Sequence, residues 1–148
     1  MYKHILIPTD GSELATKGLL HGLALAKNQG AVVTIVTVTD MWPALAMAQQ
    51  ARGSTLQPTE RYEAQAAEAA RLVLDEAVKL AQSQGINAET LHVADQHPAE
   101  GIIATATDRG CDLIVMASHG RRGLSRLMLG SQAYEVLSRS TVPVLVVR

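Results

Sequence analysis

The chain has 148 residues, which is the usual length of one domain and enough to bury a substantial core, so we expect a single domain over residues 1–148. Hydrophobic residues make up 47% and charged residues 18% of the sequence, which is an ordinary globular composition. The formal net charge of −1 argues against a nucleic-acid-binding protein and against a protein attracted to anionic membranes.

The first forty residues predict a strand, a helix and a second strand. Residues 5–7 are apolar and mostly β-branched and are followed by a proline, which is typical of a short buried strand. Ser12 can cap a helix whose apolar residues recur at helical spacing over 13–29, and Gly30 predicts its end. Residues 32–38 are almost continuously apolar, which favours a strand covered on both faces, as in a parallel sheet.

The segment 41–58 predicts a long connection. It has no clean hydrophobic period, and it contains Pro43 and Gly53, so at most one or two helical turns are expected around 44–50. Connections longer than about 12 to 15 residues are uncommon and are usually functional or mobile.

The rest of the chain predicts helices and strands in alternation. The clearest element is a helix over 59–84, which is rich in Ala, Glu, Leu and Arg, contains no Gly or Pro, and ends at Gly85. Pro98 suits the first position of another helix, which Gly110 ends. The remaining segments are strands at 89–94, 112–117 and 142–147 and a short helix at 131–138.

This alternation of strands and helices predicts the fold class. Strands joined by helices pair in parallel through right-handed crossovers, so we expect an α/β domain with a doubly wound (Rossmann-like), five-stranded parallel sheet and helices on both faces. Pro143 has no N–H and is tolerated at a sheet edge rather than in a central ladder, which puts the last strand at the edge. An apolar edge strand is an aggregation hazard unless it is covered, which suggests that 142–147 pairs with a second copy of the chain.

Two segments follow strand ends at the edge where doubly wound sheets bind ligands. One is 8–10, Pro-Thr-Asp; the other is 117–120, Ala-Ser-His-Gly, which continues to Gly130 and Ser131 at a helix start. The two glycines would let the backbone approach an anion closely and take a positive φ if needed. The unpaired N–H groups of the helix, with the serine hydroxyl, would bind a phosphate, and the aspartate is placed to accept a hydrogen bond from a sugar hydroxyl.

The residue types of this site also allow a plainer interpretation. A Gly-Ser pair at a helix start is an ordinary cap, and an Asp after a strand is more often a turn or cap residue than a sugar ligand. The standard phosphate motifs, G-x-x-x-x-G-K-[ST] and a G-x-G-x-x-G after the first strand, are absent. On residue types alone, the phosphate site and the ordinary cap are equally well supported.

The chain resembles the universal stress protein family over essentially its whole length. The matching segments occur in the family's order and are 5–12, 112–120, 129–131 and 142–147. Nucleotide-binding members of the family carry a signature of Gly, two residues, Gly, nine residues, Gly, and then Ser or Thr. The spacing of nine residues between Gly120 and Gly130 is intact, but Ala117 stands at the first glycine position. Its methyl group should be tolerated if that position has ordinary strand geometry.

The resemblance implies an adenine nucleotide as the ligand: ATP, or else ADP or AMP, with any Mg²⁺ brought by the nucleotide. The candidate binding residues share a place at the ends of the first, second and fourth strands and at the start of the 131–138 helix. Those expected around the adenosine are Pro8, Thr9, Asp10, Val38, Met116 and Ala117. Those at the phosphate end are His119, Gly120, Arg121, Gly130, Ser131 and the backbone of Gln132. The family usually forms dimers by antiparallel pairing of the last strands.

Two features near this site stay open. Arg121, with Arg122 and Arg126, could reach the outer phosphates or could form a solvated loop face, which is the commoner arrangement. An apolar cluster in the long connection could be a lid over the adenine, or could pack on the long helix or on a partner subunit. Its members are Met41, Trp42, Leu45 and Met47.

The function implied by the resemblance is that of a binding module. A homodimer would hold the nucleotide in stress response or in the regulation of an unidentified protein, with slow hydrolysis at most. No catalytic residue is predicted, because Ser131, His119 and Asp10 lack the strained G-x-S-x-G turn of hydrolases. No metal site is expected, because the histidines lack metal-ligand spacing. The alternatives are a nucleotide-free dimeric adaptor and a weak ATP-hydrolysing or phosphoryl-transferring enzyme.

The sequence also suggests a compartment. Its one cysteine, Cys111, cannot form an internal disulfide, which fits a reducing environment. No signal-peptide pattern and no apolar stretch of the roughly 20 residues needed to cross a bilayer are visible. We therefore expect a cytoplasmic protein that does not insert into membranes.

Overall fold

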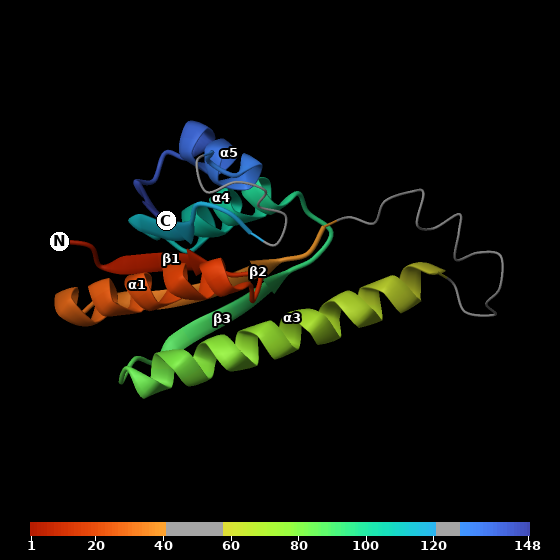
Figure 1. Cartoon of the computed structure of the whole chain (residues 1–148), viewed down its shortest axis with the longest axis horizontal. Helices are drawn as coiled ribbons and strands as arrows, with labels where there is room; N and C mark the ends of the chain where they lie inside the picture. Colours follow the sequence, from red (N-terminus) through yellow and green to blue (C-terminus); the bar gives the residue numbers. More distant parts are fainter. Residues whose placement is uncertain (41–57, 121–127) are drawn as a thin grey trace.

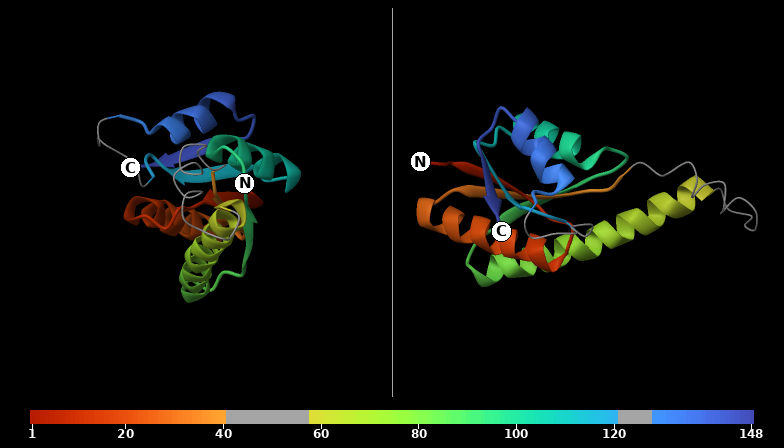
Figure 2. Two further views of the ribbon diagram at one scale, coloured as in Figure 1. Left: turned by 90° about the vertical axis from the view of Figure 1, so that its right-hand side faces the viewer. Right: turned by 45° about the horizontal axis from the view of Figure 1, so that its top comes forward.

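The computed structural model describes residues 1–40, 58–120 and 128–148. Its five strands form one parallel sheet in the order β3-β2-β1-β4-β5. Helices α1 and α3 cover one face, and α4 and α5 cover the other (Figures 1 and 2). The elements are β1 (His4–Pro8), α1 (Glu13–Gln29), β2 (Val32–Val38), α3 (Pro58–Ser83), β3 (Ala88–Val93), α4 (Pro98–Asp108), β4 (Leu113–Ala117), α5 (Ser131–Arg139) and β5 (Val144–Val147). The predicted fold class is confirmed.

The ends of α1 are set by local chemistry, as predicted. The Ser12 side chain accepts the N–H of Ala15, and Gly30 takes a left-handed φ of 65° while its N–H bonds to the Ala26 carbonyl. The other predicted elements agree to within one residue, except the last strand, which begins two residues later than predicted. Residues 41–57 of the predicted 41–58 connection lie outside the described residues, and Pro58 is the first residue of α3.

The last strand is shorter than predicted. It begins at Val144, so the prediction that Pro143 lies within the strand is wrong. Pro143 still contributes its carbonyl, which accepts the N–H of Ile114 at 2.9 Å, but it has no N–H with which to continue the ladder. The predicted place of the strand is confirmed, because β5 forms one edge of the sheet and β3 forms the other.

The core lies in two layers on either side of the sheet. Ile5, Ile7 and Val115 pack toward α1 and α3, whereas Leu6 and Ile114 pack toward α4 and α5, as strand alternation requires. All five are completely buried. Both faces of the central strands are therefore apolar, which explains their nearly continuous hydrophobic runs.

Helix α1 lies unusually close to the sheet. A Cβ atom on Gly18 would lie 3.0 Å from the backbone nitrogen of Ala117, and one on Gly22 would lie 2.5 Å from Cδ1 of Ile7. These glycines let the helix backbone pack directly on β1 and β4. This contact fixes the loop before α1 next to the carboxyl end of β4.

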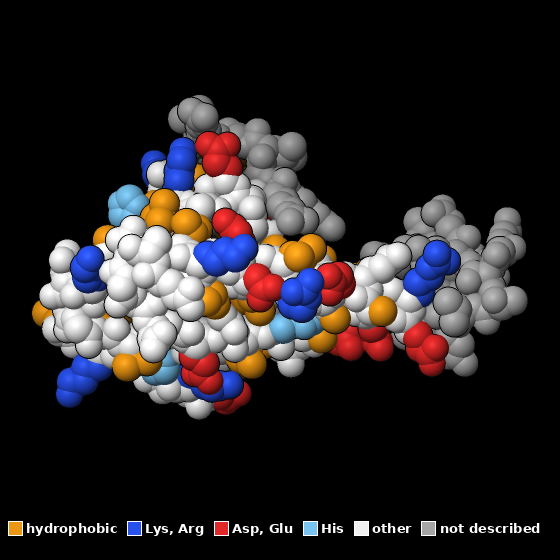
Figure 3. Space-filling view, turned by 90° about the horizontal axis from the view of Figure 1, so that it is seen from below, with side chains coloured by type: hydrophobic (Ala, Val, Ile, Leu, Met, Phe, Trp, Pro, Cys, Tyr) orange, Lys and Arg blue, Asp and Glu red, His pale blue; other side chains and the backbone are white. Residues whose placement is uncertain are grey.

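The outer face of α3 is polar. Acidic and basic side chains are interspersed on this side of the molecule (Figure 3), and Arg71 pairs with both Glu68 and Asp75. Such exposed pairs add little to stability. Among the described residues, no helix is long and apolar enough to cross a membrane.

Candidate functional site

The strand order creates a crevice at the carboxyl ends of β1 and β4. β2 and β3, which follow β1 in the chain, lie on one side of β1 in the sheet. The chain then crosses back, and β4 pairs with the other side of β1. Ligands of doubly wound sheets bind at such a switch point. The two predicted segments, 8–10 and 117–120, both end there. They touch, because a Cβ atom on Gly120 would lie 2.6 Å from Oδ2 of Asp10.

The segment after β1 is a tight, hydrogen-bonded turn. The Thr9 hydroxyl accepts the N–H of Gly11 at 3.2 Å, and Oδ1 of Asp10 accepts the N–H of Ser12 at 2.9 Å. Gly11 has a φ of 78°, which suits glycine. Asp10 therefore has the turn role that the sequence left open, and its other carboxylate oxygen faces Gly120 across the crevice.

The segment after β4 is joined to the start of α5. The N–H of Gly130 donates to the Ser118 carbonyl at 2.8 Å, and a Cβ atom on Gly130 would lie 2.7 Å from that same oxygen. Neither Gly120 nor Gly130 has a positive φ; the φ of Gly130 is −61°. At Gly130, close approach of the Ser118 backbone leaves no room for a side chain, so its conformational freedom is not the reason for glycine. At Gly120, the atom that a Cβ would meet is the carboxylate oxygen of the Asp10 side chain.

The start of α5 offers backbone donors beside this junction. Gly130 is the N-cap and makes no side-chain cap, and the first helical bond runs from the N–H of Tyr134 to the Gly130 carbonyl. The N–H groups of Ser131 and Gln132 thus have no partner within the helix, and they lie at the positive end of its dipole. Such an arrangement can bind an anion.

The Gln132 side chain has a role that sequence reasoning missed. Its Oε1 accepts the N–H of Ala99 at 3.0 Å, which caps α4 from α5. The N-cap of α4, His97, makes no cap of its own, and its Nε2 lies 2.9 Å from Oε2 of Glu135. The pKa of Glu135 is lowered by its hydrogen bonds to His97 and Arg139. The sequence did hold a signal that α4 needs a cap from another element, because no Ser, Thr, Asp or Asn stands at the cap position before Pro98.

Ala117 has ordinary strand geometry, which is the condition under which its methyl group should be tolerated. It is the last residue of β4, is 7% exposed, and pairs in register with Val147. The next residue, Ser118, continues the ladder by donating its N–H to the Val147 carbonyl at 2.8 Å. A glycine at position 117 is not needed for the backbone to reach this conformation.

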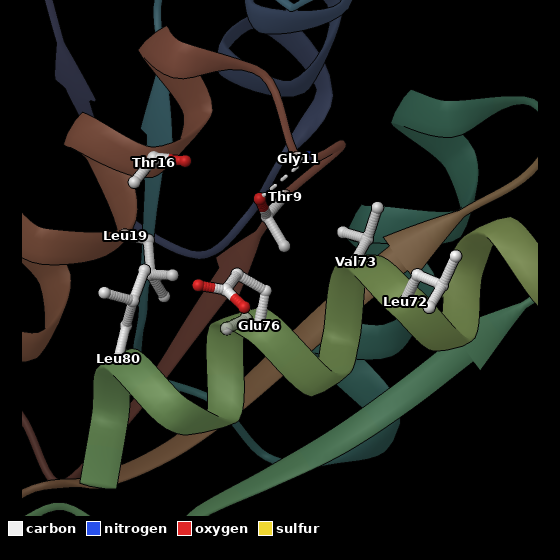
Figure 4. A pocket seen from close by; sticks show the side chains of 9 residues that line it. Thr9, Gly11, Thr16, Leu19, Leu72, Val73, Glu76 and Leu80 are labelled. Carbon is white, nitrogen blue, oxygen red and sulfur yellow. Dashed lines mark hydrogen bonds between the residues drawn. The ribbon is translucent and has the colours of Figure 1, made fainter. Parts of the chain in front are cut away.

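The sheet separates the residues predicted around the adenosine into two groups. Val38 and Met116 belong to the apolar layer under α4 and α5, and strand alternation puts Pro8 on the same side. Thr9 and Ala117 lie on the other side; Thr9 lines a cavity between α1 and α3 (Figure 4). The first group can form an apolar wall for a base, whereas the second can reach the crevice only through its backbone.

The remaining predicted residues are only partly described. His119 is half-buried, and its Nδ1 lies 3.0 Å from Oγ of its neighbour Ser118. Arg121 lies outside the described residues, as do the other two loop arginines and the apolar cluster at 41–47. In the parts that the structure describes, no group of three His, Cys, Asp or Glu side chains could hold a metal ion.

Comparisons with known proteins agree with the resemblance seen in the sequence. The sequence profile of the universal stress protein family matches residues 1–148. Universal stress protein MJ0531 of Methanocaldococcus jannaschii is 32% identical over 148 residues, which cover 100% of this chain and 83% of that protein. YxiE, a universal stress protein of Bacillus subtilis, is 32% identical over 151 residues and is covered completely (100% of both chains). The solved structure of MJ0577, also from M. jannaschii, superposes with a TM-score of 0.82 at 31% identity over 99% of this chain and 96% of that one.

Proposed function

Because this chain belongs to the universal stress protein family, we propose that it binds an adenine nucleotide in the crevice between β1 and β4. The observation that carries this proposal is the junction of Gly130 with Ser118. It holds the uncapped start of α5 against the segment 117–120, and Gly120 of that segment faces Asp10, so we place the backbone donors and the carboxylate acceptor on one crevice. Phosphate oxygens need the donors, and sugar hydroxyls need the acceptor.

Structural neighbours support this choice of ligand. A universal stress protein was crystallised in complex with cAMP, and it shares the fold with a TM-score of 0.68 at 23% identity. The universal stress protein from Archaeoglobus fulgidus was crystallised in complex with dAMP, and it superposes with a TM-score of 0.67 at 20% identity. Adenine is common to both ligands, which favours an adenine nucleotide here.

In the proposed complex, each side of the crevice has its own task. Pro8, Val38 and Met116 form the apolar wall against the base, and Asp10 accepts from a ribose hydroxyl. Backbone N–H groups of Gly120, Ser131 and Gln132 hold the phosphates, with the Ser131 hydroxyl and Arg121 as further donors. Gly130, whose own N–H bonds to the Ser118 carbonyl, holds these donors in place. Mg²⁺ would arrive with the nucleotide and keep most of its waters.

We further propose that the protein holds the nucleotide rather than consuming it. The site as described contains backbone donors, hydroxyls and one carboxylate that is already engaged by the Ser12 N–H. A homodimer formed through β5 would present two such sites to a regulated protein in stress response. Release of phosphate from ATP at many turnovers per minute would refute the proposal that the nucleotide is held without being consumed. It would favour the alternative of an ATP-hydrolysing enzyme.

Thermal unfolding in the presence of ATP, ADP, AMP and cAMP tests the proposal. A ligand at a hundred times its dissociation constant should stabilise the fold by about 2.7 kcal/mol. GTP at the same concentration is the control for specificity to adenine. If none of the four adenine nucleotides raises the unfolding temperature, and the purified protein carries none, nucleotide binding is refuted and the nucleotide-free adaptor is the better account.

A further inference from the structure

A second cavity lies on the opposite face of the sheet from the adenosine wall. It opens between α1 and α3, behind the turn that follows β1, and has a volume of about 230 Å³. Figure 4 shows Thr9 and Thr16 on one side of it and the side chains of α3 on the other. Every residue that lines it is described, and none belongs to the apolar wall formed by Pro8, Val38 and Met116.

The polar groups of this cavity are mainly acceptors. The Thr16 hydroxyl donates its hydrogen to the Ser12 carbonyl at 2.9 Å, which leaves the oxygen lone pairs as its remaining capacity. The Thr9 hydroxyl oxygen accepts from Gly11. The Glu76 carboxylate points from α3 into the same space (Figure 4). Its Oε2 lies 3.7 Å from the Lys79 ammonium, and this exposed ion pair contributes little to the stability of the fold.

The walls of the cavity are apolar. Leu19 is buried at its inner end, and Leu80 is half-buried beside it. Leu72, which also lines the cavity, is 56% exposed. A ligand that covered Leu72 would remove apolar surface from water, and this removal favours binding.

We propose that this cavity binds a small alkylammonium ion. The ammonium group would donate to the Glu76 carboxylate and to the hydroxyl oxygens of Thr9 or Thr16, and the alkyl chain would lie against the leucines. A hydrogen bond between two charged groups is stronger than one between neutral groups, so the carboxylate selects a cation. The volume is below the roughly 300 to 1,000 Å³ of pockets for drug-sized ligands, which limits the ligand to an unbranched alkyl chain of about six carbons or fewer.

The same groups disfavour the other small ligands. An anion would meet the negative charge of Glu76, the one charged side chain among the residues that line the cavity. Glu76 is 69% exposed and Lys79, which lies 3.7 Å from it, is 73% exposed and does not line the cavity. Hard metal ions prefer several oxygen ligands in a closed shell, and this cavity supplies one carboxylate and two hydroxyls. The proposal does not depend on nucleotide binding. The apolar wall of the nucleotide site lies on the other face of the sheet, and the cavity shares with the crevice only the turn that contains Thr9 and Gly11.

The test is a titration of the full chain, without nucleotide, followed by ¹H–¹⁵N NMR spectra. The probes are hexylammonium and hexanoate, which have the same length and opposite charge. Hexylammonium should give saturable shifts of the amides of Gly11, Thr16 and Ala77, and its dissociation constant should rise at least tenfold in Glu76→Gln. Hexanoate should bind at least tenfold more weakly than hexylammonium to the unmodified chain.

Two further variants complete the test. Asp75→Asn removes the adjacent carboxylate, which pairs with Arg71, and should leave the dissociation constant within twofold. Leu72→Ala should weaken hexylammonium more than propylammonium, because only the longer chain reaches Leu72. The proposal is overturned if hexylammonium gives no saturable shifts, or if hexanoate binds as tightly as hexylammonium. It is also overturned if Glu76→Gln and Asp75→Asn change the dissociation constant of hexylammonium equally, or if Leu72→Ala weakens the binding of hexylammonium and propylammonium by the same factor.

Discussion

Gly130 stands where the backbone leaves no room for a side chain. In Gly130→Ala the new methyl group would lie 2.7 Å from the Ser118 carbonyl oxygen, so the junction between them must open. Because that junction holds the start of α5 at the crevice, we expect the affinity for the preferred adenine nucleotide to fall at least tenfold, about 1.4 kcal/mol. Isothermal titration calorimetry measures the loss.

The matched control is Gly85→Ala, at the end of α3. Position 85 has open space for a methyl group but a φ of 77°, so the variant should lose roughly 1 kcal/mol of folding stability and no nucleotide affinity. Equal affinities of the two variants for the nucleotide would show that the junction at Gly130 does not form the phosphate site.

Cys111 is chemically protected by its surroundings. Burial, together with the negative charge of Asp112, raises the pKa of its thiol to about 11. At pH 8 only about one thiol in a thousand is then ionised, against roughly a quarter for a free cysteine. Labelling with iodoacetamide should therefore be at least about a hundredfold slower in the folded protein than in the chain unfolded by guanidinium. Rapid labelling of the native protein would show that the thiol is open to solvent.

Helix α4 begins without a cap of its own and depends on α5. In Gln132→Ala the N–H of Ala99 loses its acceptor, and removal of a helix cap costs about 1 kcal/mol. We expect that loss in urea unfolding, and faster hydrogen exchange at Ala99. Gln82→Ala, at an exposed position of α3, should change neither quantity.

A second substitution at the same position separates stability from binding. Gln132→Glu keeps an oxygen that can accept from Ala99, and its negative charge suits the start of α4, so stability should return. The same charge lies beside the proposed phosphate site and should weaken nucleotide binding. If the Glu variant binds nucleotide as well as the unmodified chain, the phosphates do not lie at the start of α5.

How far the sequence predicts each element depends on the range of the interactions that form it. The ends of α1 were predictable because Ser12 and Gly30 act within four residues of the groups they cap. The edge position of β5 was predictable from one proline, but its start was not, because Pro143 joins the sheet through its carbonyl alone. The bond from Gln132 to Ala99 joins residues 33 apart. The missing cap residue before Pro98 indicates that α4 needs a cap from elsewhere, but no local pattern identifies Gln132 as its source.

The candidate site also combines features that the sequence predicts with features that depend on distant contacts. That the segments after β1 and β4 meet follows from the order of strands and helices, which the hydrophobic pattern reveals. That Thr9 and Val38 face opposite sides of the sheet follows from the register of each strand, which is fixed by packing of the whole core. A list of site residues taken from sequence therefore identifies the edge of the sheet but not the face.

The proposed homodimer would form at the open edge of β5. Carbonyls of Pro143 and Val147 accept from β4, and in a parallel ladder every second residue makes both bonds to the same neighbour, so Val144 and Val146 point their N–H groups outward. Pairing with a second copy would use those groups. If the chain dimerises through β5 as proposed, the unmodified chain should sediment as a dimer in analytical ultracentrifugation. Val146→Pro, which removes one of these N–H groups without touching the ladder to β4, should then sediment as a folded monomer. Val146→Ala loses similar side-chain volume but keeps the N–H, so it should remain dimeric. A dimer that persists in Val146→Pro must use another surface.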